Sequence, residues 1–388
     1  MSPKKLMKGM ASIFAQALVH LLQPLADDGA DEFVERVQHR FRHFTYKGQA
    51  VDVKQVGREL GVRYVLEGSV RKAGGRVRIT GQLIDAETGA HLWADRFDGS
   101  LDDVFELQDQ IAISVAGVIE PALQAAETAR SASRPTDDLT AYDLYLRALQ
   151  HTRSWERDSV AQGLELVEEA IARDPRFGAA SSLAALYHVV MCLNGWSEDA
   201  EASRLAGIDL ARKALRAASE DPRALVHSAY AFGFFGEDIA AAIALAARAL
   251  EMNPSFAVGW YFSGYLRLWA GQPDVAIEQF ATSVRLSPND RPARALFGTG
   301  LGHFFAGRLE KARATLLQSL QEFPGWAPNY RFLAACCAHL GQKEEAREFV
   351  RRLRDLTPVV VPDASHWRNP EHRELYLSGL RLAAGHTT

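Results

Sequence analysis

The sequence predicts a small α+β domain at the amino end, followed by an all-α, right-handed superhelix of repeated helix pairs. Three observations predict this fold class. Apolar and polar residues alternate with a period of two between Tyr64 and Phe97, as in strands of a sheet with one buried face. A polar stretch at residues 129–138 then separates two regions of different pattern. Beyond it the apolar residues recur at helical spacing, and prolines return about every 34 residues.

Composition and charge exclude several classes of protein. The 388 residues include 24% charged side chains and carry a formal net charge of −4, so no general attraction draws the chain to nucleic acid or to an anionic membrane. No apolar run reaches the roughly 18 residues of a transmembrane helix, so no membrane span is predicted. Three cysteines do not make a disulfide framework, which favours a reducing, cytoplasmic location.

The amino end leaves a second location open. Three lysines among the first eight residues precede a mostly apolar stretch from Met10 to Leu22, an arrangement that loosely resembles a signal peptide. Export would place the protein in the periplasm or envelope. Because Gln16 and His20 interrupt the stretch and no small-x-small cleavage site follows, we favour an amphipathic surface helix.

We divide the first region into a divergent helical amino terminus, residues 1–40, and an α+β domain, residues 41–128. The elements expected in this domain are a helix at 52–60 and strands at 64–73, 76–85 and 91–97. Gly74-Gly75 is a two-residue hairpin turn that tolerates positive φ, so the strands form an antiparallel meander.

A long amphipathic helix is expected after the meander. Ser100 and Asp103 form an S-x-x-D capping box, which is typical of a helix start, and apolar residues follow at helical spacing as far as Ile119. This stripe would cover one face of the meander, as in other α+β domains. The polar stretch at residues 129–138 is then the linker to the second region.

The second region, residues 139–358, repeats one unit that is clearest at Ser255–Pro288. Two helical patterns flank the turn at Ala270–Pro273, and a proline closes the unit. Prolines that punctuate the other units are Pro175, Pro222, Pro254, Pro324 and Pro358. A helix pair this short cannot bury its own apolar face, so it needs neighbours on both sides. We expect about six pairs, with residues 359–388 as a capping helix and tail.

This unit resembles the tetratricopeptide repeat. The residues that carry the resemblance are Trp260, Gly264, Ala276, Phe280 and Pro288. In that family the first helix of each pair lines a concave groove. The residues expected to project into the groove are Tyr261, Tyr265, Phe297, Leu301, Phe304 and Arg331. Aromatic side chains with one arginine suit capture of an extended or helical peptide, and packing against the neighbouring repeat is the alternative for each of them.

The first domain resembles a second family. The stretch from Val56 to Gly99, which includes YVLEGSVRKAGGRVRITGQLIDAETGAHLWADRFDG, is similar to the TolB-like or FlgO-like domain. In bacteria that domain often stands between a class III adenylate cyclase or a CadC-like winged-helix domain and a tetratricopeptide array. The resemblance therefore implies the regulatory part of such a protein. No paired metal-binding aspartates of a cyclase and no recognition helix can be placed in residues 1–45, and the family's first strands lack a clear match there.

A glycine-rich stretch at residues 298–302, GTGLG, superficially resembles a phosphate loop. A nucleotide loop needs a strand before it and a helix after it, and this stretch lies inside a predicted helix. We therefore interpret these glycines as positions of close helix packing.

Two charged clusters of the first domain could bind ions or an anionic partner. The basic cluster at the hairpin tip consists of Arg71, Lys72, Arg76 and Arg78. The acidic cluster after the meander consists of Asp95, Asp98, Asp102 and Asp103, with His91 nearby. We interpret the first as a solvated face and the second as turn and capping chemistry, so we predict no catalytic, cofactor-binding or metal-ligating residue.

The sequence thus predicts a non-catalytic interaction protein that binds a partner protein or peptide in the concave groove and uses no cofactor. Two alternatives stay open. One is an envelope-associated component, since FlgO-like domains also occur in surface-associated proteins. The other, weaker alternative is an enzyme that uses the acidic residues after the meander. The partner's identity and the oligomeric state are not indicated.

Overall fold

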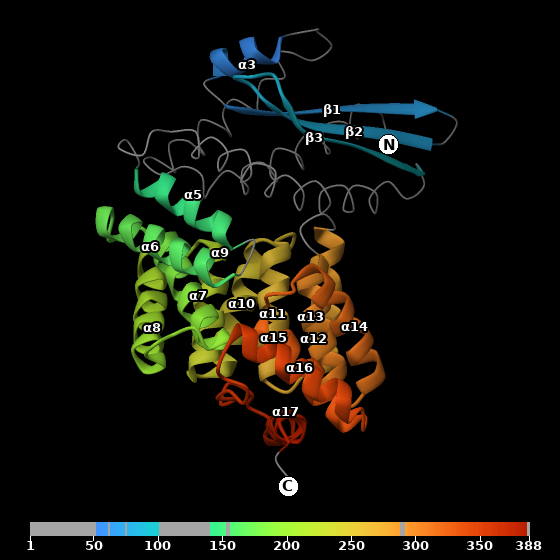
Figure 1. The fold of residues 1–388 in the computed structure, drawn as a ribbon. Coiled ribbons are helices and arrows are strands. Elements are labelled where there is room, and N and C mark those ends of the chain that lie inside the picture. Colours follow the sequence, from blue (N-terminus) through green and yellow to red (C-terminus); the bar gives the residue numbers. More distant parts are fainter. Residues whose placement is uncertain are drawn as a thin grey trace. The chain divides into compact units, whose positions relative to one another are not determined.

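The computed structural model forms two compact units, Met1–Glu127 and Thr128–Thr388 (Figure 1). The residues it describes are 52–60, 63–73, 76–100, 140–152, 156–287 and 292–385. The predicted amino-terminal helices, the helix opened by the capping box and the linker lie outside these residues, and they stay predictions.

The described part of the first unit is the expected antiparallel meander, in the order β1-β2-β3. Its elements are α3 (Val53–Leu60), β1 (Tyr64–Ala73), β2 (Arg76–Asp85) and β3 (His91–Ser100). Strand β3 runs past its predicted end at Phe97, because pairing with β2 continues until Ser100 lies opposite Arg76.

Two local features fix the geometry of this meander. Gly81 is buried against Trp93, where an added Cβ atom would lie 2.9 Å from the indole ring, so the strand needs a residue without a side chain there. At the second turn the Asp85 carboxylate accepts hydrogen bonds from the backbone N–H groups of Glu87 and Thr88 at 2.9 and 2.8 Å. This is the Asx-turn chemistry that makes aspartate common in turns.

The second unit is a stack of helix pairs. The first, inner helices of the pairs are α5 (Ala141–His151), α7 (Gly178–Asn194), α9 (Pro222–Phe235), α11 (Ala257–Trp269), α13 (Pro292–Phe305) and α15 (Ala327–His339). The second, outer helices are α6 (Arg157–Arg173), α8 (Ala200–Ala217), α10 (Ile239–Met252), α12 (Pro273–Leu286), α14 (Leu309–Glu322) and α16 (Lys343–Leu356). Each pair packs on the next, so the predicted fold class is confirmed.

Proline and a preceding Asp or Asn mark the boundaries before α7, α9 and α11. Pro222 is the first residue of α9, where a missing N–H costs nothing, and the Asp221 carboxylate accepts the N–H of Arg223 at 2.8 Å. At the next boundary Asn253 Oδ1 accepts the N–H of Ser255 at 3.1 Å, around Pro254. The repeated dipeptides therefore end an outer helix and start the following inner helix.

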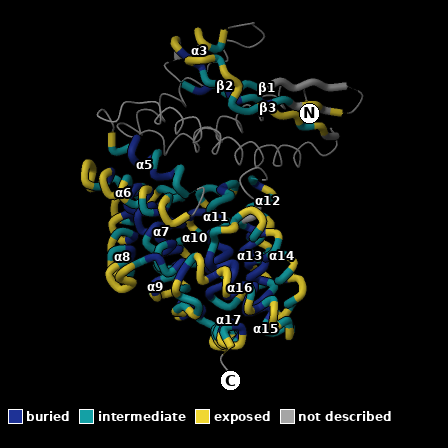
Figure 2. The backbone as a smooth tube through the Cα atoms, in the orientation of Figure 1, coloured by how far each residue is buried: buried dark blue, intermediate teal, exposed yellow. Residues whose placement is uncertain are grey.

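Burial differs between the two sets of helices (Figure 2). Inner helices such as α7 and α15 are buried on nearly every side, whereas outer helices such as α14 and α16 bury one stripe of residues. The large side chains of Trp269, Phe280 and Phe304 are fully enclosed between pairs. The core is therefore continuous along the stack, as expected for repeats that cannot fold singly.

The glycines at 298–302 lie within α13 and serve close helix packing, which confirms their interpretation. A Cβ atom on Gly298 would lie 2.3 Å from the Phe280 ring, and one on Gly300 would lie 2.7 Å from Leu316. Gly302 meets Ile277 in the same way at 2.6 Å. These positions bring α13 close to both neighbouring outer helices, α12 and α14.

Arginines connect pairs that are far apart in sequence. Arg294 of α13 donates to the carbonyl oxygen of Thr152, just after α5. Arg331 of α15 donates to the carbonyl oxygens of Leu193 at 2.9 Å and Asn194 at 3.4 Å, at the end of α7. The last carbonyls of a helix have no partner within it and attract cations. Each bond joins an inner helix to the helix pair that lies four pairs earlier in the chain, so the inner surface is narrow.

The carboxyl-terminal helix is present as α17 (Pro370–Ala383), and its role as a cap on the stack stays a prediction. An inner helix of the array normally packs on the outer helix before it, as α11 does on α10. Helix α17 instead packs mainly against the inner helix α15 and only marginally against α16. It therefore folds back onto the inner surface, because its apolar residues find aromatic partners there.

Candidate functional site

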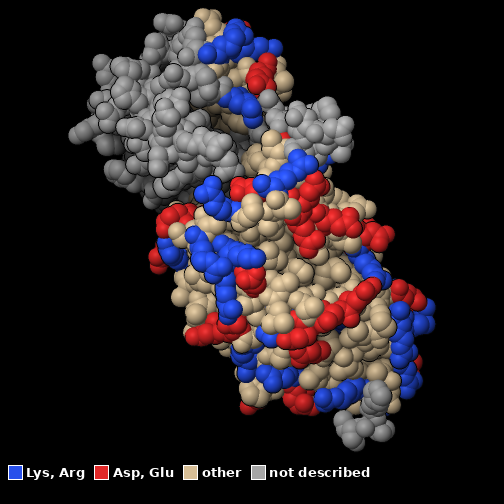
Figure 3. Space-filling model, turned by 90° about the vertical axis from the view of Figure 1, so that its left-hand side faces the viewer, with Lys and Arg blue, Asp and Glu red and all other residues tan. Residues whose placement is uncertain are grey.

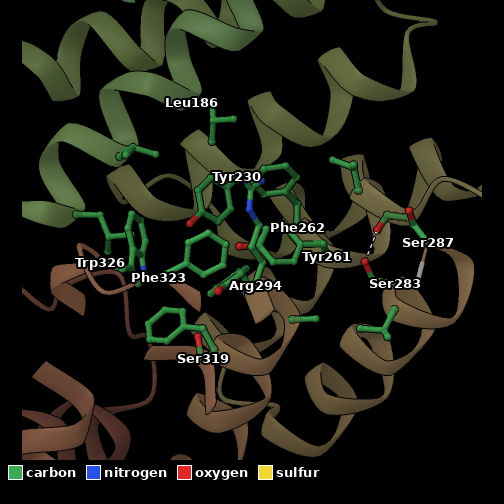
Figure 4. Close-up of a pocket in the computed structure, with 18 residues that line it drawn as sticks. Leu186, Tyr230, Tyr261, Phe262, Ser283, Ser287, Arg294, Ser319, Phe323 and Trp326 are labelled. Carbon is green, nitrogen blue, oxygen red and sulfur yellow. Dashed lines mark hydrogen bonds between the residues drawn. The ribbon is translucent and has the colours of Figure 1, made fainter. Parts of the chain in front are cut away.

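A pocket of about 100 Å³ opens on the inner surface of the array. Inner helices α7, α9, α11 and α13 supply most of its walls, and the rest comes from α12, α14 and the turn before α15. Figure 4 shows Tyr230, Tyr261, Phe323 and Arg294 together at its centre. Residues from five successive pairs thus meet at one place, which requires the superhelix to be formed.

Aromatic rings form one wall of the pocket. Tyr261 and Tyr265 are four residues apart on α11, so they share one helix face, and their ring centroids lie 5.1 Å apart in an edge-to-face arrangement. Tyr230 of α9 packs on Phe262 at 4.8 Å and on Tyr265 at 5.9 Å. Such edge-to-face clusters are rigid and present both apolar faces and hydroxyl groups.

The polar groups of the pocket are phenols, serines and one cation. Burial raises the pKa of Tyr261 and of Tyr265, so both phenols keep their protons at neutral pH and can donate hydrogen bonds. The Arg294 guanidinium lies 5.9 Å from the centroid of the Phe323 ring. No Asp or Glu is among the residues that line the pocket. The site therefore combines apolar surface with donors and positive charge.

Three of the six residues predicted for the groove lie in this pocket. Tyr261, Tyr265 and Phe297 all line it. Tyr261 is partly exposed, whereas Tyr265 and Phe297 are only 6% and 5% exposed. Their side chains therefore form the floor of the pocket while also packing against the neighbouring helices.

The other three predicted groove residues do not line the pocket and are packed in the core, which is the alternative considered for each of them. Leu301 and Phe304 lie further along α13, where Phe304 packs edge-to-face on Phe305 and Phe332. Arg331 is 1% exposed and makes its bonds to the backbone at the end of α7. The reason is that the inner surface is narrow beside the carboxyl-terminal half of α13, whereas Arg331 of α15 is covered by the end of α7 and by Val359.

Sequence reasoning missed most of the pocket lining, including Trp326, Tyr230 and Arg294. Trp326 had a usable signal, because an aromatic residue also follows the boundary proline by two positions at Phe177 and Phe256. Tyr230 stands at the same distance after Pro222 as Phe262 does after Pro254, so its inner-helix position was also readable. Arg294 had no local signal, because its bond to Thr152 joins parts of the chain 142 residues apart.

The charged clusters of the first unit do not form a site among the described residues. Arg78 lies opposite Asp98 in the strand register and donates to its carboxylate at 2.7 Å. This hydrogen bond holds the pKa of the Asp98 carboxyl below its usual range, as in an ordinary cross-strand ion pair. The described residues contain no group of three His, Cys, Asp or Glu placed to hold a metal ion. Cluster members whose side chains lie outside the described residues are Arg71, Lys72, Asp102 and Asp103.

The surface of the array offers no large area of one charge on the face seen in Figure 3. Lys and Arg alternate there with Asp and Glu around a broad uncharged area. Many of the charges are paired, for example Arg248 with Glu220 and Arg204 with Glu201. In the part of the chain that the structure describes, no helix is both long and apolar enough to cross a bilayer.

Comparison with known proteins gives one partial sequence match. No family model matches the chain. A curated relative from Rhizobium meliloti (strain 1021), named "Putative adenylate cyclase 3", is 36% identical over 180 residues. The match covers 46% of this chain and 31% of the relative, so the chain spans less than a third of that relative's length.

Several solved structures are similar in fold. "MamA 41-end from Desulfovibrio magneticus RS-1" is 19% identical with a TM-score of 0.33, covering 45% of this chain and 94% of that one. The Cut9–Hcn1 assembly of APC/C is 14% identical with a TM-score of 0.45, covering 72% and 49%. YrrB, described as a TPR protein with an unusual peptide-binding site, is 18% identical with a TM-score of 0.30, covering 50% and 92%. At these values the likenesses say nothing about a ligand, and the tetratricopeptide-like array is defined by the helix pairs themselves.

Proposed function

We propose that the array is a non-catalytic scaffold that binds a partner polypeptide, and that the pocket on its inner surface receives a side chain of that partner. The observation that carries this proposal is the lining of the pocket. Tyr230, Tyr261 and Tyr265 converge there with Arg294, and no acidic side chain is present. Aromatic residues and arginine are the side chains that dominate binding energy at protein interfaces.

The size of the pocket favours one side chain over a small-molecule cofactor. Its volume of about 100 Å³ is below the roughly 300–1,000 Å³ of sites that enclose drug-sized ligands. The phenol hydroxyls and the arginine favour an electron-rich group, such as a backbone carbonyl or a carboxylate beside an apolar side chain. The partner is therefore expected to present an extended segment with one apolar anchor and a nearby acidic group.

The partial sequence match supports a signalling context for this scaffold. In this proposal the chain corresponds to the regulatory part of an adenylate cyclase-like protein, with a TolB-like or FlgO-like domain before the array, and acts in the cytoplasm. The support is the 36% identity over 180 residues, together with the residue pattern from Val56 to Gly99. No catalytic step is assigned to the chain.

Replacing Tyr261 with alanine tests the proposal. We expect Tyr261→Ala to weaken partner binding at least about tenfold, because a central aromatic anchor typically contributes 2 kcal/mol or more. Partners recovered by the full-length wild-type protein and by the variant are compared by quantitative mass spectrometry, followed by affinity measurement. Helical content should stay nearly unchanged, because Tyr261 is partly exposed.

The matched control is Leu205→Ala on the outer helix α8, where the side chain is 56% exposed and is not part of the pocket lining. This variant should bind every partner as the wild type does. If Tyr261→Ala retained the same partners with the same affinities as Leu205→Ala, the pocket would not be the binding site.

A further inference from the structure

The carboxyl-terminal tail, residues 357–385, crosses the inner surface of the array. Thr357 and Val359 lie against Gly195 at the end of α7, within the space that a Cβ atom would need. His366 lies between Phe234 of α9 and Trp269 of α11, with ring centroids 4.9 and 5.6 Å away. The tail therefore touches the carboxyl-terminal ends of successive inner helices.

Trp367 and Arg368 are the anchors of the tail. Trp367 is 3% exposed and its ring lies 4.4 Å from that of Phe305. Arg368 donates to the carbonyl oxygens of Gly233 at 2.8 Å and Glu237 at 3.3 Å, at the end of α9. A buried aromatic side chain next to an arginine that donates hydrogen bonds to backbone carbonyls is typical of a hot spot at a binding interface.

The helix of the tail completes this contact. The ring of Tyr376 stacks on Phe332 of α15, with centroids 4.4 Å apart and planes at 16°. His339 Nε2 lies 2.7 Å from the carbonyl oxygen of Leu375. A Cβ atom on Gly379 would lie 2.8 Å from that of Ala335, so α17 approaches α15 closely. These contacts all involve an inner helix.

The link between the array and the tail has no regular structure. The pair α15 and α16 is complete at Leu356, and Thr357 ends α16 as its C-cap. Pro358 and Pro362 flank a short connection in which Val361 is 38% exposed. The tail is thus attached to a finished array through a short connection that contains two prolines and is exposed at Pro358 and Val361.

We propose that the tail is an intramolecular ligand of the array. The inner surface at the ends of α9, α11, α13 and α15 is a binding site for a segment that carries tryptophan followed by arginine and continues into a short helix. The chain's own tail is its occupant, and it closes this surface to other polypeptides. The inference is independent of the proposed function, because no tail residue lines the pocket.

Cutting the link tests this inference on the full chain. A site for a sequence-specific protease is placed after Val361, and the purified protein is cleaved. We expect the released fragment to stay bound by its own contacts and to exchange with a labelled synthetic peptide of residues 362–385. The uncleaved protein should not bind this peptide, since its surface is occupied.

Peptide variants define the anchors. A peptide with Trp367→Ala and Arg368→Ala should bind about 100-fold more weakly than the natural sequence, the loss expected for two hot-spot residues. The control peptide carries Leu382→Ala, which removes a side chain that is 42% exposed and should leave the affinity unchanged. Equal binding of all three peptides would contradict the assignment of the anchors.

A full-length variant without the protease site controls for misfolding caused by inserting that site. In full-length Trp367→Ala, we expect the tail to become sensitive to protease, the array to keep its helical circular dichroism, and the labelled peptide to bind. Loss of array helicity on cleavage and in this variant would show that the tail is part of the core, and the inference would be overturned. Departure of the fragment without rebinding of the peptide would overturn it as well.

Discussion

Arg331→Ala is expected to lower the free energy of unfolding by at least about 3 kcal/mol, the largest loss of any single substitution considered. Arg331 is almost fully buried, and its guanidinium donates to the carbonyl oxygens of Leu193, Asn194 and Val359. Its removal leaves three carbonyls without this donor, one of them at the buried residue Asn194. The substitution also removes the bonds that join α15 to α7 and to the start of the tail.

The measurement is urea unfolding of the full-length protein followed by far-ultraviolet circular dichroism. Arg331→Lys should recover only part of the loss, because an ammonium group cannot span three oxygens as the planar guanidinium does. Arg212→Ala is the matched control, since Arg212 forms an exposed ion pair with Glu237 and should cost less than about 1 kcal/mol. Equal stability of the Arg331 and Arg212 variants would contradict the role of Arg331 in closing the superhelix.

Gly298→Ala is expected to destabilise the array by about 1–3 kcal/mol, although alanine is the better helix former. The added Cβ atom would lie 2.3 Å from the Phe280 ring, which is fully buried and cannot move away without displacing α12. Overpacking of a fixed core therefore outweighs the gain in helix propensity. Urea unfolding of the full-length variant gives the change in free energy.

A second substitution separates overpacking from other causes. In the double variant Gly298→Ala with Phe280→Leu, the smaller side chain makes room, so the combined loss should be less than the sum of the single losses. Gly325→Ala is the control, because a Cβ atom there would meet nothing closer than 4.0 Å. A strictly additive double variant would mean that Gly298 and Phe280 are not in conflict over this space.

The elements that local patterns define were predictable from sequence. The period-two stretch around Leu83 gave the strands, and the Asp-Pro and Asn-Pro boundaries gave the helix pairs, because strand alternation and helix termination depend on neighbouring residues. The packing role of Gly298 was also predictable, since a glycine in a helix interior is unfavourable unless a neighbour needs the space. These predictions required no knowledge of distant contacts.

The shape of the inner surface was not predictable, because contacts between distant residues determine it. Arg294 with Thr152, Arg331 with Leu193 and Arg368 with Gly233 each join residues more than 130 positions apart. The sequence contains many arginines, and no local pattern indicates which carbonyl oxygens these three bond. The expectation of an open groove therefore placed Leu301, Phe304 and Arg331 on a surface that the superhelix and the tail enclose.

Only part of the candidate site was predictable, because the rest also depends on contacts between distant residues. Tyr261 and Tyr265 share a face of one inner helix, and that relation follows from their spacing of four residues. The cation of the pocket is Arg294 of α13, two inner helices after α9, which carries Tyr230. Its place depends on how the pairs stack. A repeat pattern identifies the inner face of a helix, whereas the width of the channel depends on the whole array.

The most direct test of the central claim is photo-crosslinking from the pocket. A photoreactive amino acid is placed at Val284, which lines the pocket on α12, and separately at Leu205 on the outer surface. We expect illumination to join the Val284 protein to a discrete polypeptide, Tyr261→Ala to abolish this adduct, and the Leu205 position not to form it. An adduct that persists in Tyr261→Ala, or that forms equally from Leu205, would contradict a partner side chain in the pocket.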